Sequence, residues 1–331
     1  MEASVGDLTS RGYGAVLWEP DDKTVRDARV TRFMTWLAGR GTLNPGGYQD
    51  LWHWSVTDPA AFWSAVWDYF GVLGDRGDGP ALAGQVMPDV QWFPGATLNY
   101  ARNALRTAWT DPDRTAIIFD SERGRAGSLS YGDLAQQVAR VARGLAGLGV
   151  GPGDRVAALL PNVPEAVVGL LAAASLGAIW SSCSPDFGAQ SVIDRFAQIK
   201  PTVLIVCDGY AYNGQEYSRA EMVAEVTAAL PGLSAVVQVN LLSPRDGEDE
   251  AAPAVGALAW DDLGSGGDQH EPEFEEVPFA HPLWVVYSSG TTGLPKPIMH
   301  GHGGVVLEHL KALSIHQDLR PGDVFTWYTT T

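Results

Sequence analysis

From residue 115 onward, short apolar runs alternate with stretches in which apolar residues recur every three or four positions. The short runs predict strands at residues 115–119, 155–160, 178–180, 202–206 and 235–239. The periodic stretches predict helices over residues 130–148, 164 onward, 189–199 and 221–230. Strands separated by roughly ten to fifteen helical residues imply right-handed crossovers. The pattern therefore predicts an α/β fold, with mostly parallel sheets flanked by helices.

Local signals mark where these helices begin and end. Ser130 is a good N-cap for a helix whose apolar stripe runs from Leu134 to Leu148, and the glycines of residues 149–153 end it. The longest apolar run, residues 166–180, is interrupted by glycine and serine and is shorter than the ~20 residues of a membrane span. We expect it to be a buried helix that leads into a buried strand.

The first 95 residues have a different character. Eight of the twelve tryptophans precede residue 110: Trp18, Trp36, Trp52, Trp54, Trp63, Trp67, Trp92 and Trp109. Helices are expected over residues 24–40 and 58–70, capped by Thr24 and opened by Pro59. Aromatic side chains bury large areas, so we favour a region that packs on a larger body over a stacking platform for ligands. Residues 1–95 are thus predicted as a Trp-rich helical region and residues 96–331 as the main domain.

The alternation of predicted strands and helices is interrupted at residues 242–281, which are rich in Asp, Glu, Gly and Pro. They predict an acidic surface excursion, mobile at residues 245–250. After it we expect a strand at 282–286, a helix at 303–316 and a strand at 324–328. The sequence then stops at Thr331 without a cap or turn, which predicts that it is a piece of something longer.

Charge and cysteine content narrow the classes of function. The 331 residues are 45% hydrophobic and 18% charged, and the net charge is −17. This excess of negative charge argues against nucleic-acid and anionic-membrane partners, so an anionic ligand needs local attraction. Cys183 and Cys207 form no CxxC pair and are expected as core thiols of a cytoplasmic protein. The N-terminus has no signal-peptide pattern.

Candidate chemistry concentrates in the stretch that follows the strand at 282–286. Its hydroxyl residues are Ser288, Ser289, Thr291 and Thr292, its turn glycines are Gly290 and Gly293, and its cation is Lys296. Hydroxyls and closely approaching amide N–H groups can donate to phosphate oxygens, and Lys296 supplies positive charge. Pro295 and Pro297 hold the chain extended on both sides of the lysine. We interpret the stretch as a polyphosphate-binding loop, in preference to a flexible surface loop.

Other known sequence motifs fit these residues less well than a polyphosphate-binding loop does. A Walker A loop requires its lysine to open a helix, which Pro295 and Pro297 prevent at Lys296. The glycines of residues 147–153 follow a helix and precede a strand, the reverse of a dinucleotide fingerprint, so they predict a turn. His300 and His302 lack a third ligand at zinc-like spacing, and we favour a role at the entry of the next helix. Spacing suggests no Ser-His-Asp set.

The stretch from Tyr287 to Lys296, YSSGTTGLPK, resembles the phosphate-binding signature of the adenylate-forming enzymes, the superfamily of acyl-CoA synthetases, luciferases and adenylation domains. Residues 90–103, VQWFPGATLNYARN, resemble a segment near the start of the acetyl-CoA synthetase branch. The Trp-rich segments LWHWSV at 51–56 and AFW at 61–63 look most like acetoacetyl-CoA synthetases. The likeness implies an incomplete N-terminal large domain without its C-terminal small domain. It departs from the family at Pro297, where Gly or Ala is usual.

The resemblance implies an ATP-dependent ligase with two steps. Acetoacetate attacks the α-phosphorus of ATP to give an acyl-adenylate and pyrophosphate, and coenzyme A then displaces AMP. Ser288, Ser289, Gly290, Thr291, Thr292, Gly293 and Lys296 would hold the phosphates together with Mg²⁺. Lys296 would stabilise pyrophosphate, whereas the main catalytic lysine of the family lies in the small domain. Residues 208–216 lie where relatives contact the nucleotide of coenzyme A, although Asp208 and Glu216 carry the wrong charge.

Two alternatives stay open at this stage. One is a ligase for acetate, propionate or another short acid. The other is a truncated, non-catalytic protein that binds a nucleotide or a partner protein. We also expect residues 1–331 to have no turnover by themselves, because the family's later motifs are absent from them.

Overall fold

The computed structural model describes residues 16–84, 86–242, 256–266, 271–288 and 293–330. Contacts between Cα atoms divide the chain into two units. Unit 1 contains Met1–Tyr69 and His309–Phe325, and unit 2 contains Phe70–Glu308 and Thr326–Thr331. Residues 70–95 thus group with unit 2, and the domain boundary near residue 95 stays a prediction.

Unit 2 is built on a seven-stranded sheet in the order β13-β12-β9-β7-β8-β15-β16. Its strands are β7 (Arg155–Leu159), β8 (Ile179–Cys183), β9 (Val203–Cys207), β12 (Ala235–Val239), β13 (Leu258–Ala259), β15 (Pro282–Ser288) and β16 (Lys296–Gly301). All neighbouring strands are parallel except β15 and β16, which form an antiparallel hairpin. The predicted α/β class with a mostly parallel sheet is confirmed.

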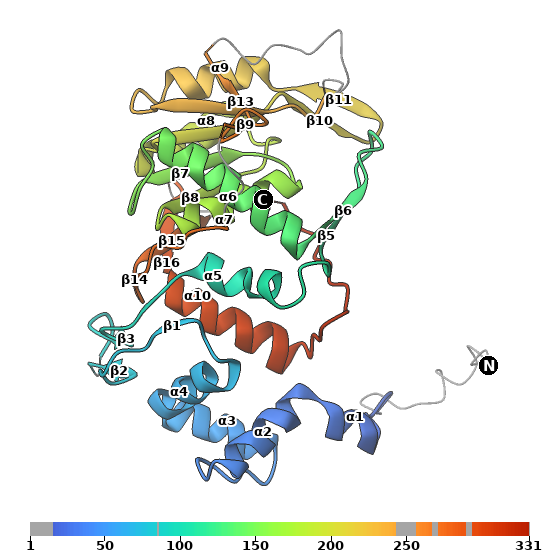
Figure 1. Cartoon of the computed structure of the whole chain (residues 1–331), viewed down its shortest axis with the longest axis vertical. Helices are drawn as coiled ribbons and strands as arrows, with labels where there is room; N and C mark the ends of the chain where they lie inside the picture. Colours follow the sequence, from blue (N-terminus) through green and yellow to red (C-terminus); the bar gives the residue numbers. More distant parts are fainter. Residues whose placement is uncertain (1–15, 85, 243–255, 267–270, 289–292, 331) are drawn as a thin grey trace, which may run out of the picture. The chain divides into compact units, whose positions relative to one another are not determined.

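Alternating residues of the central strands face two separate hydrophobic cores. In β7, Val156 and Ala158 belong to one core, and Ala157 and Leu159 belong to the other. The first core also receives helices α6 (Tyr131–Gly147) and α7 (Pro164–Ser175), and the second receives α8 (Ala189–Ile199) and α9 (Ala220–Ala228). The sheet therefore carries helices on both faces, as can be followed in Figure 1. Burial on both sides explains why these strands are continuously apolar.

The predicted signals at helix starts are present. Ser130 caps α6, its hydroxyl accepting from the Asp133 N–H while the Asp133 carboxylate accepts from the Ser130 N–H. Pro164 occupies the first turn of α7, and nearly every residue of α7 is buried. The apolar run at residues 166–180 is therefore a buried helix leading into a strand, as expected.

Two hairpins extend from the body of unit 2 and meet at their tips (Figure 1). They are β5–β6 (Thr115–Phe119 and Gly127–Ser130) and β10–β11 (Gly209–Tyr212 and Gln215–Ser218). The Glu122 carboxylate accepts from the backbone N–H groups of Asn213 and Gly214, and Arg123 pairs with Glu216. The turn of one hairpin therefore caps the turn of the other.

Parts of the segment expected as an acidic excursion belong to the sheets. β13 pairs with β12, and Trp260 and Leu263 beside it are buried against α6 and the first core. Val277 in β14 (Val277–Pro278) pairs with β4 (Thr97–Leu98), which also pairs with β1 (Gly74–Asp75). The stretch expected to be mobile, 245–250, lies outside the described residues. The other short elements of unit 2 are β2 (Leu82–Ala83), β3 (Gln91–Trp92) and α5 (Tyr100–Ala104), with a 3-10 turn at Arg106–Trp109.

The N-terminal part of unit 1 consists of α1 (Asp22–Asp27), α2 (Arg29–Gly39), α3 (Tyr48–Thr57) and α4 (Pro59–Phe70). Its aromatic side chains pack on one another: Phe33 contacts the rings of Trp36, Phe62 and Tyr69. The single helix expected over 24–40 is wrong. Asp21, not Thr24, caps its start, and the extended ψ of 138° at Ala28 breaks it.

Near the C-terminus, the helix expected at 303–316 is present and the strand expected at 324–328 is not. The helix begins at His302 as α10 (His302–His309) and continues as a π-helical turn, Leu310–His316. Residues 324–328 form no strand, and their side chains are exposed. A strand requires a neighbour to pair with, and none of the described residues supplies one to this segment.

Candidate functional site

The predicted phosphate-binding loop connects β15 to β16. Because β15 runs parallel to β8, and β8 to β7, the loop leaves the sheet at the edge where those strands also end. Ligands of open α/β sheets bind at this edge, where the carboxyl ends of parallel strands meet. The loop therefore lies where the fold places a ligand site.

Three of the predicted loop residues are described, namely Ser288, Gly293 and Lys296, and all three are exposed. Ser288 ends β15 and lies opposite Lys296, the first residue of β16. Gly293 has φ +144°, and a β-carbon there would meet nothing within 4 Å, so the backbone conformation rather than space favours glycine. Ser289, Gly290, Thr291 and Thr292 lie outside the described residues.

The positive charge of Lys296 is left available by the surrounding chain. No carboxylate of the described residues forms an ion pair with it. Pro297 lies opposite Tyr287 in the hairpin, on the outermost strand of the sheet as far as the structure describes it, where a missing N–H is tolerated. Of the extended chain expected on both sides of Lys296, the part that follows the lysine is present as β16, which begins at Lys296.

Both stems of the loop are hydrogen-bonded to α8. The Tyr287 hydroxyl donates to the Arg195 carbonyl oxygen over 2.7 Å. On the other stem, the Gln198 amide donates to the Pro295 carbonyl oxygen over 3.0 Å. Sequence analysis did not find Arg195 and Gln198. Their three-residue spacing puts them on one face of a helix, but nothing local shows that this face meets the loop.

The Arg195 side chain packs between two aromatic rings beside the loop. Its guanidinium lies 5.0 Å from the ring centre of Phe187 and 5.8 Å from that of Tyr287, and it donates to the Ser191 hydroxyl. Burial, and to a smaller degree the neighbouring Cys183 thiol, raises the pKa of Tyr287 to about 12. Tyr287 therefore remains a hydrogen-bond donor at any ordinary pH.

The two cysteines and His302 are buried in the fold. Cys183 and Cys207 are free and buried, and burial raises the pKa of each thiol to about 12, as expected of inert core thiols. His302 opens α10 and is fully buried, whereas His300 is exposed on β16. The backbone N–H of Tyr100 donates to His302 Nδ1 over 3.1 Å. The expected helix-entry role thus fits His302.

The negative charges at 208–216 are occupied within the chain. The Asp208 carboxylate accepts from the backbone N–H groups of Leu241 and Leu242, and Glu216 pairs with Arg123. The Arg219 guanidinium lies 5.0 Å from the ring centre of Tyr210, in the same hairpin. Both carboxylates therefore act in holding the hairpin.

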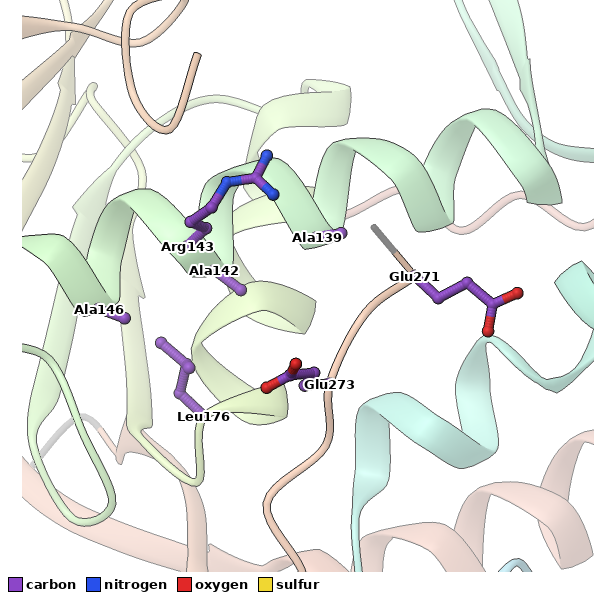
Figure 2. Close-up of a pocket in the computed structure, with 7 residues that line it drawn as sticks. All are labelled: Ala139, Ala142, Arg143, Ala146, Leu176, Glu271 and Glu273. Atoms are coloured by element: carbon purple, nitrogen blue, oxygen red, sulfur yellow. The ribbon is translucent and has the colours of Figure 1, made fainter. Parts of the chain in front are cut away.

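A separate pocket of about 240 Å³ lies between α6, the end of α7 and the segment at 271–273. Figure 2 shows its lining, with three alanines and Arg143 of α6 facing Leu176 and two glutamates: Ala139, Ala142, Ala146, Glu271 and Glu273. It contains none of the predicted site residues. Three of its seven lining residues are charged and the other four are apolar.

Two further searches cover only the residues that the structure describes. No group of three or more His, Cys, Asp or Glu side chains among them could hold a metal ion. Nor is any of the described helices long and apolar enough to cross a membrane.

Comparison with known proteins yields consistent matches. The family of AMP-binding enzymes matches residues 105–331, and the N-terminus of acetyl-coenzyme A synthetase matches residues 48–104. The chain is 41% identical to acetoacetyl-coenzyme A synthetase of Rhizobium meliloti (strain 1021) over 95% of its own length. It is 37% identical to malonamoyl-CoA synthetase of Penicillium aethiopicum over 86% of its length.

The structural comparison agrees with these matches. Acetoacetyl-CoA synthetase from Streptomyces lividans matches with a TM-score of 0.88 at 48% identity, covering 96% of this chain and 48% of that one. The chain likewise spans only 47% of the Rhizobium meliloti protein and 40% of the Penicillium aethiopicum protein. By the family match to more than half its length, the chain belongs to the AMP-binding enzymes and is a homologue of the acetoacetyl-CoA synthetases.

Proposed function

We propose that the complete protein is an acetoacetate–CoA ligase that forms AMP and pyrophosphate. The observation that carries this proposal is the phosphate-binding signature, which lies at the ligand-binding edge of the sheet in a chain homologous to acetoacetyl-CoA synthetases. The relatives are about twice as long as this chain, so the activity is proposed for the complete protein.

In this proposal the loop grips the β- and γ-phosphates of ATP. Hydroxyl and amide donors of residues 288–293, together with Lys296, hold the phosphates while the carboxylate of acetoacetate attacks the α-phosphorus. The bond from the α-phosphorus to the bridging oxygen breaks, and negative charge develops on the departing pyrophosphate. Donors already in place stabilise that charge without reorganising. The coenzyme A thiol then attacks the acyl carbon and releases AMP.

Magnesium and coenzyme A have different roles in the proposed reaction. Mg²⁺ commonly binds through substrate phosphates plus one or two carboxylates. The described residues form no cluster of three possible metal ligands, and we assign Mg²⁺ no ligand among them. Coenzyme A is a substrate, and the hairpin at 208–216 is our candidate for contacting its nucleotide. The two buried free thiols agree with a reducing compartment, and we place the reaction in the cytoplasm.

The acyl substrate is tested by ATP–pyrophosphate exchange on the complete protein, which reports the first step without coenzyme A. We expect acetoacetate to give the highest kcat/KM in a panel with acetate, propionate and malonamate. The second candidate is an acetate ligase, favoured by the match of residues 48–104 to the acetyl-coenzyme A synthetase N-terminus. Faster exchange with acetate would select it, and no exchange with any acid would favour a non-catalytic nucleotide-binding protein.

The role of Lys296 is tested by Lys296→Ala in the complete protein. A hydrogen bond to a charged group contributes about 1.5–3 kcal/mol, so we expect kcat/KM for ATP to fall about tenfold to a hundredfold. Lys23→Ala is the matched control, since Lys23 is an exposed lysine of α1 that pairs with Asp27. Unchanged exchange kinetics in Lys296→Ala would show that the loop is scaffolding. Separately, we expect residues 1–331 alone to give no exchange.

A further inference from the structure

The two ends of the phosphate loop, Ser288 and Lys296, receive support from inside and from outside the hairpin. Within the hairpin, the ladder between β15 and β16 extends to the pair Ser288 and Lys296. Outside the hairpin, other side chains contact the residues next to this pair, Tyr287 and Pro295.

Helix α8 contacts both stems. Tyr287 on the incoming stem donates to the Arg195 carbonyl oxygen at 2.7 Å, and Pro295 on the outgoing stem accepts from the Gln198 side chain at 3.0 Å. The two partners are only three residues apart on one helix face. The loop is thus held by both ends on a single short piece of α8.

The helix itself is rigidly placed. Val192 and Phe196 are fully buried in the second core, between α8, α9 and the sheet. The neighbouring strand adds a third attachment, because the Ser181 hydroxyl of β8 donates to the Val285 carbonyl oxygen of β15 at 2.9 Å. A buried helix attached to the sheet can hold a loop stem more firmly than another loop can.

We propose that α8 preorganises the phosphate loop, with Gln198 and Tyr287 as positioning residues for the nucleotide's phosphates. This inference rests on the proposed function of the loop. Neither residue needs to touch the nucleotide. Each acts by raising the fraction of molecules in which the loop already has its binding shape.

A positioning role has a kinetic signature that separates it from a role in folding. If only a fraction of molecules is competent to bind, the apparent dissociation constant rises in inverse proportion to that fraction. Once ATP saturates the site, the loop is in place and turnover proceeds as before. Loss of a positioning residue therefore raises KM for ATP and leaves kcat unchanged, whereas loss of folded protein lowers kcat and leaves KM unchanged.

The experiment uses Gln198→Met, which keeps the length of the side chain and removes its donor, in the complete protein. Gln198 is exposed, so the substitution does not disturb the core. The matched control is Gln190→Met on the same helix, because among the described residues the Gln190 amide donates to Asp194 of α8 rather than to a loop stem. Tyr287→Phe removes the second hydrogen bond and keeps the ring beside Arg195.

In ATP–pyrophosphate exchange we expect Gln198→Met and Tyr287→Phe each to raise KM for ATP about three- to tenfold, the effect of one neutral hydrogen bond. The kcat and the KM for the carboxylate should stay within about twofold of wild type, as should every parameter of Gln190→Met. The double variant should raise KM for ATP further than either single variant.

Two results would overturn the inference. In the first, KM for ATP is unchanged in both variants, or kcat falls at constant KM. In the second, Gln190→Met raises KM as much as Gln198→Met does. Lys296→Ala separates this failure from failure of the proposed function. If Lys296→Ala weakens ATP while the α8 variants do not, only the positioning role is lost. If Lys296→Ala also has no effect, the loop does not bind phosphate at all.

Discussion

At the scale of single residues, His300 and His302 show how position alone decides a side chain's chemistry. They lie two residues apart, yet His300 is exposed and His302 is fully buried with Nε2 lacking a hydrogen-bond partner among the described residues. Burial, followed by the nearby His281, lowers the pKa of His302 to about 3. Since Nδ1 accepts from Tyr100, the ring is neutral with its proton on Nε2.

This burial predicts an acid-sensitive contribution to stability. The unfolded chain protonates His302 near its ordinary pKa of about 6.5, whereas the folded chain does so only near about 3. Stability from this residue is therefore complete above about pH 6.5 and is lost as the pH falls, by at most about 1.4 kcal/mol per pH unit. His302→Asn should be less stable than wild type at pH 8 but lose less stability between pH 6 and pH 4.

The measurement is the free energy of unfolding in urea at several pH values. His300→Asn on the exposed strand tests whether the loss of any histidine gives the same effect. Parallel stability curves for wild type and His302→Asn between pH 6 and pH 4 would contradict the assignment of a neutral, buried His302.

At the scale of elements, signals in the local sequence predicted the bounds of helices and strands where those bounds depend on neighbouring residues. Helix α8 and strands β5 and β12 have the predicted bounds, and Ser130 and Pro164 open their helices as expected. Features that depend on distant partners were not predictable. The strand expected at 324–328 is absent from the described residues, and Trp260 packs against a helix more than a hundred residues earlier in the chain.

The candidate site also combines features that have a local sequence signal with features that depend on distant residues. Glycine, hydroxyl and lysine residues next to one another in sequence marked the loop. Its attachments to Arg195 and Gln198 span separations of 92 and 97 residues, and only the folded sheet brings α8 beside the hairpin. Burial of Tyr287, which keeps its hydroxyl a donor, is likewise a property of packing and has no local signal.

Two glycines of α6 give a prediction that belongs to the helix as an element. A β-carbon on Gly144 would lie 2.5 Å from Leu263 and 2.8 Å from the backbone nitrogen of Gly264, whereas one on Gly147 would meet nothing within 4 Å. Gly144→Ala should lower the free energy of unfolding by about 1–3 kcal/mol through overpacking. Gly147→Ala, the control at the helix end, should be neutral or stabilising by up to about 1 kcal/mol.

Thermal or urea unfolding of the two variants, with wild type alongside, checks this difference. If Gly144→Ala and Gly147→Ala were equally stable, the segment at 256–266 would not pack on α6 as closely as the structure describes.

At the scale of the whole molecule, the β5–β6 hairpin links elements of unit 2 that are far apart in the sequence. Glu122 and Arg123 attach it to the β10–β11 hairpin, and Arg125 attaches it to the start of α7 through the carboxylate of Glu165. Glu165 is only 5% exposed, and Arg125 donates to both of its carboxylate oxygens. The same guanidinium lies over the Phe119 ring, 5.5 Å from its centre.

Breaking this buried ion pair on one side should be strongly destabilising. Glu165→Met leaves Arg125 without its carboxylate, and we expect the free energy of unfolding to fall by about 3–5 kcal/mol. Glu276→Met is the control: its pair with Arg102 is solvent-exposed, so the loss should stay below about 1 kcal/mol. In a double-mutant cycle, Arg125→Met with Glu165→Met should destabilise less than the sum of the single changes. Additive losses would mean that the two side chains act independently.

The high pKa of Tyr287 also limits how the site can respond to acidity. A phenol that keeps its proton up to about pH 12 can donate to the Arg195 carbonyl oxygen in mildly acidic and in mildly alkaline solution alike. If the loop binds phosphate as proposed, a fall in ATP affinity on mild acidification would not come from loss of this hydrogen bond, whereas the terminal phosphate of the ligand takes up a second proton near pH ~6. The attachment of the incoming stem to α8 would thus stay the same while the charge of the ligand changes.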